Sequence, residues 1–295
     1  MGTDAPMDAA SVARAYDALI EQVAAWAEEQ SNIRAVLIVG SRARTEHPAD
    51  AWSDLDLVIF AADPRVYLDD TSWPARFGEV WLTFLEETAV GGGVERRVLY
   101  RGGLDVDFSV FPVSQIDALA ASEAVSVLAR GVRVVLDKDR QMERLIVAAS
   151  SPVGRELPTE AAFLQDVHDF WYHAVWIAKK LRRGEVWTAV RCCNGLLPAH
   201  LLQMIEWQAR TAEGAAPDTW HQGRFLEEWA DPRVLAQLRG ALAHYDAEDT
   251  WRALTASMDL YRRLSHEVAA NLGYPVPDAA EEHATALVRQ LAAQR

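Results

Sequence analysis

The run "DLDLVIF" (residues 54–60) opens with two aspartates, Asp54 and Asp56, and is otherwise as apolar as a buried strand. Side chains alternate along a strand, so both carboxylates would lie on one face and the leucines on the other. Two negative charges held this close must be neutralised, protonated or bridged by a cation. Carboxylates with this spacing suit Mg²⁺, which combines a few protein carboxylates with phosphate oxygens and water. The simpler interpretation is a solvated strand end.

A second run, "LDVDFSVF" (104–111), places Asp105, Asp107 and Ser109 on one face of another predicted strand. It could supply a third carboxylate if it lies beside the first strand. Such a cluster would be able to hold metal ions at a reacting phosphate.

The run "IRAVLIV" (33–39) leads directly into Gly40, Ser41 and Arg42. Glycine lets a backbone approach a ligand closely, and Ser41 offers both N–H and hydroxyl donors, so a phosphate fits this turn. Arg42 could add charge-assisted bonds to it. A Gly-Ser pair is usually only a turn, but together with three aspartates it favours metal-assisted phosphoryl or nucleotidyl transfer.

These residues need a sheet to position them, and the apolar patterns predict one. We expect a first helix over 7–30 and strands over 33–39, 54–60, 79–86, 95–101, 104–111 and 132–137. A Pro, Gly and Ser-rich linker over 151–160 precedes helical patterns at 160–184, 185–210, 246–273 and 278–294. The chain is therefore predicted to have an α+β domain (1–150) and a helical domain (151–295).

Composition narrows the choice of partner. The 295 residues carry a formal net charge of −14, which opposes nucleic acid as the main partner and would attract a cationic one. There is no signal-peptide pattern and no apolar run long enough for a membrane span, so we expect a cytoplasmic protein that does not bind membranes. The only cysteines, Cys192 and Cys193, are expected to be buried or half-buried thiols.

The segment "VGSRARTEHPADAWSDLDLVIF" (39–60) resembles the G-S-R and D-x-x-S-D-x-D pattern of the aminoglycoside 6-adenylyltransferases, within the DNA polymerase β-type nucleotidyltransferase superfamily. The likeness continues in family order through "DVDFSVFP", "VRVVLDKD", "HDFWYHAVWIAKKLRRGE" and "NGLLPAHLLQMIEWQ". It implies a nucleotidyltransferase-type mixed sheet flanked by helices, followed by a helical bundle. It also implies transfer of AMP from ATP to a hydroxyl of a cationic aminoglycoside, first of all the 6-position of streptomycin.

Carried onto this chain, the resemblance implies two Mg²⁺ ions. Asp54 and Asp56 would hold the ion that bridges the triphosphate, and Gly40 with Ser41 would cradle the terminal phosphates. Asp107 would join them on the second ion, and whether it also takes the hydroxyl proton stays open. The alternatives are another acceptor, either a small metabolite or a protein hydroxyl, and a binding module without activity.

The likeness also suggests residues of the helical half. Lys179 matches a family lysine and follows Tyr172 by seven residues, so both share a helix face; Lys179 would reach the triphosphate or simply favour the helix dipole. Asp169 is the candidate contact to the cationic drug, with Tyr172 beside it on the substrate side; the alternatives for Asp169 are a helix surface charge and a buried ion pair.

Other residues are less informative. Trp26, Trp207 and Trp251 are expected in the core, and the histidines form no metal or triad pattern. The likeness fades over residues 88–100, which leaves three possible acceptor-side carboxylates without a role: Glu86, Glu87 and Glu95.

Overall fold

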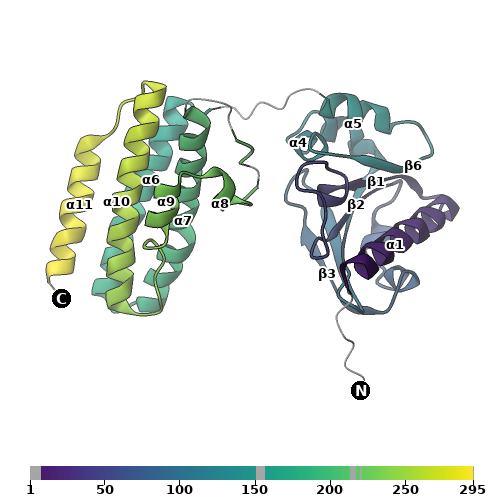
Figure 1. The fold of residues 1–295 in the computed structure, drawn as a ribbon, viewed down its shortest axis with the longest axis horizontal. Helices are drawn as coiled ribbons and strands as arrows, with labels where there is room; N and C mark the ends of the chain where they lie inside the picture. Colours follow the sequence, from purple (N-terminus) through teal and green to yellow (C-terminus); the bar gives the residue numbers. More distant parts are fainter. Residues whose placement is uncertain (1–7, 151–156, 213–216, 220, 295) are drawn as a thin grey trace, which may run out of the picture. The chain divides into compact units, whose positions relative to one another are not determined.

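The computed structural model describes residues 8–150, 157–212, 217–219 and 221–294. The chain folds into two compact units, Met1–Gly154 and Arg155–Arg295. Figure 1 shows the first as a sheet with helices and the second as a helical assembly. The predicted linker at 151–160 lies mostly outside the described residues.

The first unit is built on a mixed six-stranded sheet in the order β3-β4-β5-β2-β1-β6. Strands β2 and β5 run parallel, whereas the other neighbouring pairs are antiparallel. The strand bounds are β1 Ile33–Val39, β2 Leu55–Ala61, β3 Val80–Glu87, β4 Val94–Tyr100, β5 Asp105–Pro112 and β6 Arg133–Asp137. All six strands were predicted, with ends that differ by one residue at most sites.

Helices cover both faces of this sheet. Helix α1 (Ala9–Glu29) starts at Asp8, whose side chain accepts a hydrogen bond from the Ser11 N–H, and it packs in one cluster with Leu55, Leu57 and Ile59. The opposite face packs Phe60 and Phe111 against α3 (Ile116–Ala120) and α5 (Met142–Ala149). Because side chains alternate along β2, Asp56 lies on the same face as Phe60, the face that α3 and α5 cover.

The short helices of this unit were not predicted. They are α2 (Arg65–Leu68), α3, α4 (Val125–Leu128) and α5, together with the 3-10 turns η1 (Gly40–Arg42), η2 (Trp73–Arg76) and η3 (Val113–Gln115). Most of them are too short for an apolar repeat to be visible in the sequence.

The second unit consists of helices, as predicted. They are α6 (Glu160–Arg182), α7 (Val186–Thr211), α8 (Leu226–Trp229), α9 (Pro232–Leu238), α10 (Ala247–Leu272) and α11 (Asp278–Ala293). Trp207 and Trp251 lie in its core, as Trp26 does in the core of the sheet unit. Cys192 is half-buried and Cys193 buried, which confirms the expected thiols.

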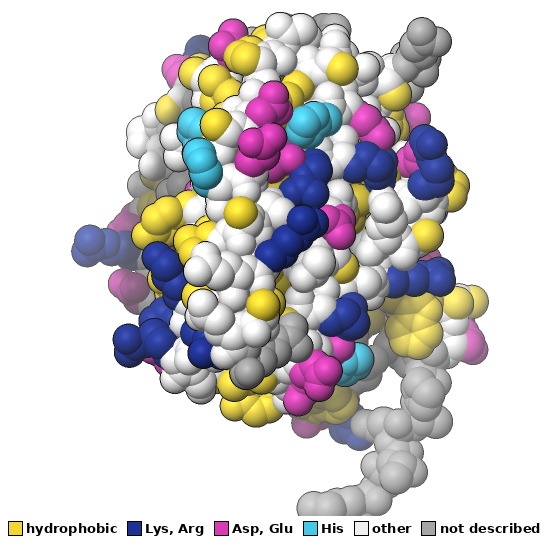
Figure 2. All heavy atoms as spheres, turned by 90° about the vertical axis from the view of Figure 1, so that its left-hand side faces the viewer, with side chains coloured by type: hydrophobic (Ala, Val, Ile, Leu, Met, Phe, Trp, Pro, Cys, Tyr) yellow, Lys and Arg dark blue, Asp and Glu magenta, His cyan; other side chains and the backbone are white. Residues whose placement is uncertain are grey.

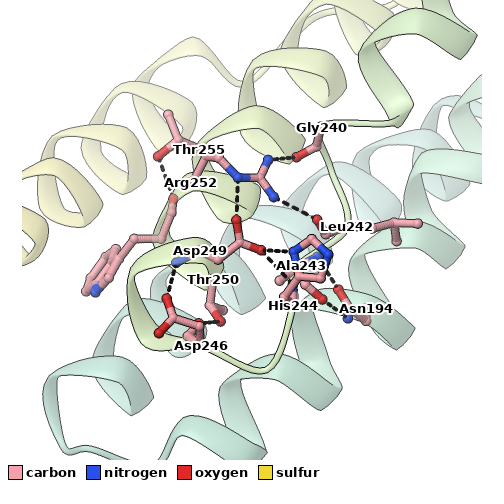
Figure 3. Close-up of polar contacts among 11 residues, drawn as sticks. Asn194, Gly240, Leu242, Ala243, His244, Asp246, Asp249, Thr250, Arg252 and Thr255 are labelled. Carbon is pink, nitrogen blue, oxygen red and sulfur yellow. Dashed lines mark hydrogen bonds and ion pairs between the residues drawn. The ribbon is translucent and has the colours of Figure 1, made fainter.

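A polar network fastens the start of α10 (Figure 3). Asp249 accepts hydrogen bonds from the His244 N–H and from Arg252, and Arg252 also donates to the carbonyls of Gly240 and Leu242. The Asn194 side chain from α7 makes two hydrogen bonds to the backbone of Ala243. The loop before α10 is thereby joined to α7.

Helix α11 packs on α6 and α10. Its buried Glu281 pairs with both Arg262 and His266 of α10. The α11 side of this unit presents acidic, basic and histidine side chains together (Figure 2). Among the described residues, no helix is both long and apolar enough to cross a membrane.

Candidate active site

Three aspartates from two neighbouring strands converge on the sheet. Asp56 of β2 is directly opposite Asp107 of β5 in the parallel pair, and Asp54 immediately precedes β2. One carboxylate oxygen from each of the three lies within 4.8 Å of the others. The sequence predicts that these aspartates meet if the two strands lie side by side, and the strand register brings them together.

The Gly-Ser turn borders this cluster. Val39, the last residue of β1, is opposite Asp56, so the chain enters the turn beside the carboxylates. Gly40 has φ +68°, and a Cβ atom placed on it would lie 2.0 Å from Asp56 Oδ2. Only glycine leaves room for the Asp56 carboxylate here. The Oγ of Ser41 is buried, with no hydrogen-bond partner within the described part of the chain.

Arg42 is directed at the backbone that carries Asp54. Its guanidinium donates to the carbonyls of Ser53 and Asp54, at 2.9 Å each, and stacks 3.5 Å from the centre of the Tyr16 ring. Tyr16 in turn bonds the backbone of Asp105 through its hydroxyl. Arg42 thus braces the residues before β2 against α1, a contact that the sequence did not indicate. Its predicted phosphate contact remains a prediction.

Strand β4 adds a charged group that the sequence analysis missed. Arg97 is opposite Asp107 in the β4–β5 pair, and its guanidinium nitrogen lies 3.2 Å from Asp107 Oδ2. The same guanidinium reaches Glu86 at 2.8 Å and Glu95 at 3.0 Å. The charged run "ERR" over 95–97, inside a predicted strand, could have indicated a polar site. Only the pairing of β4 with β5 shows that Arg97 is the residue opposite Asp107.

Glu95 was one of the three carboxylates left without a role, and it lies in this cluster. Its side chain accepts a hydrogen bond from Ser109 Oγ at 3.1 Å and is buried. Glu86 lies opposite Glu95 on β3, and its neighbour Glu87 ends that strand. Glu95 and Arg97 therefore extend the polar cluster from β5 to β4.

The donor set fits a divalent cation. Asp107 is 4% exposed, and its Oδ1 has no hydrogen-bond partner in the described residues. Burial, opposed by Arg97 and reinforced by nearby carboxylates, raises the pKa of Asp107 to about 7. Three carboxylates packed this closely, one of them with an unpaired buried oxygen, are suited to a hard cation such as Mg²⁺.

The predicted residues of the helical half lie on α6. Tyr172 and Lys179 are exposed. The carboxylate of Asp169 is 37% exposed and lies 2.6 Å from His173 Nδ1. A role for these three residues beside the aspartates stays a prediction. Trp171, on the same helix, is buried in the core.

Carboxylates from adjacent strands beside a close-approach glycine turn define a class of protein, the enzymes that transfer phosphoryl or nucleotidyl groups with the help of metal ions. The family model described as streptomycin adenylyltransferase matches residues 13–291. The chain belongs to this family of aminoglycoside adenylyltransferase enzymes.

Individual relatives are distant but of matching length. An aminoglycoside 6-adenylyltransferase from Campylobacter jejuni is 24% identical over 270 residues, covering 90% of this chain and 92% of its own. One from Staphylococcus aureus is 22% identical over 268 residues, covering 87% and 92%. The crystal structure of an aminoglycoside 6-adenyltransferase from Bacillus subtilis is 19% identical, with a TM-score of 0.46 over 93% of this chain and 98% of that one.

Proposed function

We propose that the protein transfers AMP from ATP to a hydroxyl of an aminoglycoside in a Mg²⁺-dependent reaction that releases pyrophosphate, with the 6-position of streptomycin as the first acceptor to test. The observation that carries the reaction is the aspartate cluster, whose three carboxylates lie within 4.8 Å beside the Gly40 turn. The choice of acceptor rests on the family description and on the names of the relatives.

In this proposal Asp54, Asp56 and Asp107 hold two Mg²⁺ ions. When bound, the ions would neutralise triphosphate charge and lower the pKa of the attacking hydroxyl. Gly40 would let the backbone approach the terminal phosphates, and Ser41 would donate to them from its N–H and hydroxyl. Arg42 holds the Asp54 backbone in place and is proposed as a further phosphate contact, together with Lys179 from α6.

Two carboxylates are available to accept the proton of the acceptor hydroxyl. Asp107 is a metal ligand in this proposal, whereas Glu95 lies one strand away and is held by Ser109 and Arg97. Glu95 therefore offers a base that need not be coordinated. Asp169 and Tyr172 are proposed to contact the drug, because a carboxylate suits a cationic group and an exposed aromatic ring suits a sugar face.

The test is direct. The purified protein is incubated with ATP, MgCl₂ and a panel of aminoglycosides, and the drugs are examined for the mass of one added AMP unit. Modified streptomycin, with the adduct mapped to its 6-hydroxyl, would support the full proposal. Pyrophosphate release with another metabolite or a protein, and no adduct on any drug, would contradict the acceptor while keeping the nucleotidyl transfer.

A further inference from the structure

A largely buried histidine links three helices of the second unit. His200 of α7 places Nδ1 2.8 Å from Asp166 Oδ1 of α6, and the other oxygen of Asp166 accepts a hydrogen bond from Tyr261 of α10 at 2.7 Å. The His200 side chain is 11% exposed and meets the Phe170 ring edge to face. Because a carboxylate only accepts, Nδ1 of His200 carries the hydrogen in this contact.

The other ring nitrogen has no such partner. Nε2 of His200 is buried and makes no hydrogen bond within the described residues, and it lies 3.8 Å from Asp169 Oδ1. The Asp169 carboxylate is 37% exposed, so a ligand can reach it, and its same oxygen lies 2.6 Å from Nδ1 of His173. Asp169 thus stands between a buried and a partly exposed histidine.

Nε2 of His200 can be protonated or unprotonated, and the two protonation states differ in whether the ring compensates the negative charge of Asp169. With a hydrogen on Nε2, the ring is a cation whose N–H faces the carboxylate and compensates its charge. Without that hydrogen, Nε2 no longer compensates the carboxylate. A cationic ligand on the exposed part of Asp169 would then take the place of the imidazolium as its counter-charge.

We propose that His200 is a positioning residue for the acceptor: a proton on its Nε2 and a cationic group of the aminoglycoside compete for Asp169. Binding of the cation releases this proton to solvent, and acidification returns it. The inference rests on the proposed function, which makes Asp169 the contact to the cationic drug. It adds a second group, from a different helix, to that contact.

The charges around His200 support a proton being present before the drug binds. Burial of the ring lowers the pKa of His200, but the hydrogen bond to Asp166 and the charges of Asp166 and Asp169 outweigh it, so the pKa is raised above its ordinary value. The other titratable groups at these carboxylates are Tyr261 of α10, Cys192 of α7 and His173 of α6. A histidine whose pKa is raised by neighbouring carboxylates is suited to exchange a proton on binding.

The experiment is an NMR titration of the histidine side chains of the full-length protein, with the His200 signal assigned by its loss in His200→Asn. In the protein without drug, Asp169→Asn is expected to lower the pKa of His200. Streptomycin is expected to lower it in the wild type, and calorimetry in buffers of different ionisation enthalpy should detect proton release. The streptomycin Kd should rise about tenfold for each pH unit below the pKa of His200.

Two variants of similar size separate the competition from a structural role. His200→Asn can keep a donor toward Asp166 but has no Nε2, so its streptomycin Kd should lose this pH dependence. His266→Asn removes a histidine that pairs with Glu281 instead, and it should keep the dependence. A His200→Asn protein whose Kd keeps the wild-type pH profile would overturn the inference.

Failure of the inference and failure of the proposed function are distinguishable. If Asp169→Asn leaves the His200 titration unchanged, the two residues are not coupled and the inference is overturned, even if streptomycin is modified normally. If no aminoglycoside is bound or modified, the proposed function fails, and the titration of the protein alone still decides whether His200 and Asp169 share a proton.

Discussion

Asp56 and Asp107 stand directly opposite each other in the parallel pair formed by β2 and β5. The contact joins residues from distant parts of the sequence, and Asp54 completes the cluster from the residue just before β2. The same register places Asp107 beside Arg97 of β4. The reaction proposed for this cluster can be tested residue by residue.

Removing one carboxylate should remove the metal site. Asp56→Asn or Asp107→Asn is expected to lower kcat about 1,000-fold, because a bound metal contributes several kcal/mol of charge stabilisation. Pyrophosphate release measures the rate, and MgCl₂ should no longer raise the melting temperature. The matched control is Asp105→Asn, an exposed carboxylate on the same strand outside the cluster. Wild-type turnover in Asp107→Asn would disprove the metal assignment.

Magnesium binding should depend on pH through Asp107. Because the pKa of this buried carboxyl is raised to about 7, it holds a proton below that pH, and Mg²⁺ must displace the proton to bind. The rise in melting temperature caused by MgCl₂ should therefore be larger at about pH 8 than at about pH 6. An equal rise at both values would contradict this assignment.

Without metal, the folding stability should change with pH in the opposite direction, falling as the pH rises. A raised carboxyl pKa contributes stability at low pH that is lost as the pH rises through the folded-state value. In EDTA, the free energy of unfolding should fall between about pH 4 and pH 7, and Asp107→Asn should show a smaller fall. Urea denaturation at a series of pH values measures both.

Gly40→Ala should inactivate the enzyme for a steric reason. The added methyl group would lie 2.0 Å from Asp56 Oδ2, so the carboxylate must move. The control is Gly92→Ala, because Gly92 also has a positive φ (+62°) but nothing lies within 4 Å of an added Cβ. Backbone strain alone costs about 1 kcal/mol in either variant. If both variants lose activity equally, displacement of Asp56 is not the cause.

Arg42→Lys should test the hydrogen bonds from Arg42 to the backbone carbonyls of Ser53 and Asp54. A lysine cannot donate to the carbonyls of Ser53 and Asp54 in the same way or stack as well on Tyr16, so the free energy of unfolding should fall by about 2 kcal/mol, together with kcat. Tyr16→Phe keeps the ring under Arg42 and should retain that contact. If Arg42→Lys instead leaves stability unchanged and raises the KM for ATP, Arg42 acts on the phosphates.

Glu95→Gln should separate the two candidate bases. If Glu95 takes the acceptor proton, kcat falls about 100-fold or more with little change in the KM for ATP. Ser109→Ala removes the hydrogen bond to Glu95 and should have a smaller effect in the same direction. A near-normal rate in Glu95→Gln would show that Glu95 is not the base, and Asp107 would remain the candidate that accepts the proton of the acceptor hydroxyl.

Much of the sheet unit could be predicted because its signals are local. The apolar runs marked all six strands, and the aspartates stood out because charged residues interrupt those runs in "DLDLVIF" and "DVDFSV". The short helices between strands escaped prediction, since elements such as α3 are too brief to show a repeat. Glu95 and Arg97 could not be assigned, because only the register of β4 against β5 places Glu95 opposite Ser109 and Arg97 opposite Asp107.

The amino-acid sequence by itself determined which face of each strand carries acid and which carries hydrocarbon, because alternation along a strand is a property of the local chain. Only the tertiary structure decided which residues from different strands meet, because strand register depends on pairing between distant segments. It put Asp107 between Asp56 and Arg97 and turned Arg42 toward the Asp54 backbone. It also left Nε2 of His200 facing Asp169, a relation between two helices that no local pattern could reveal.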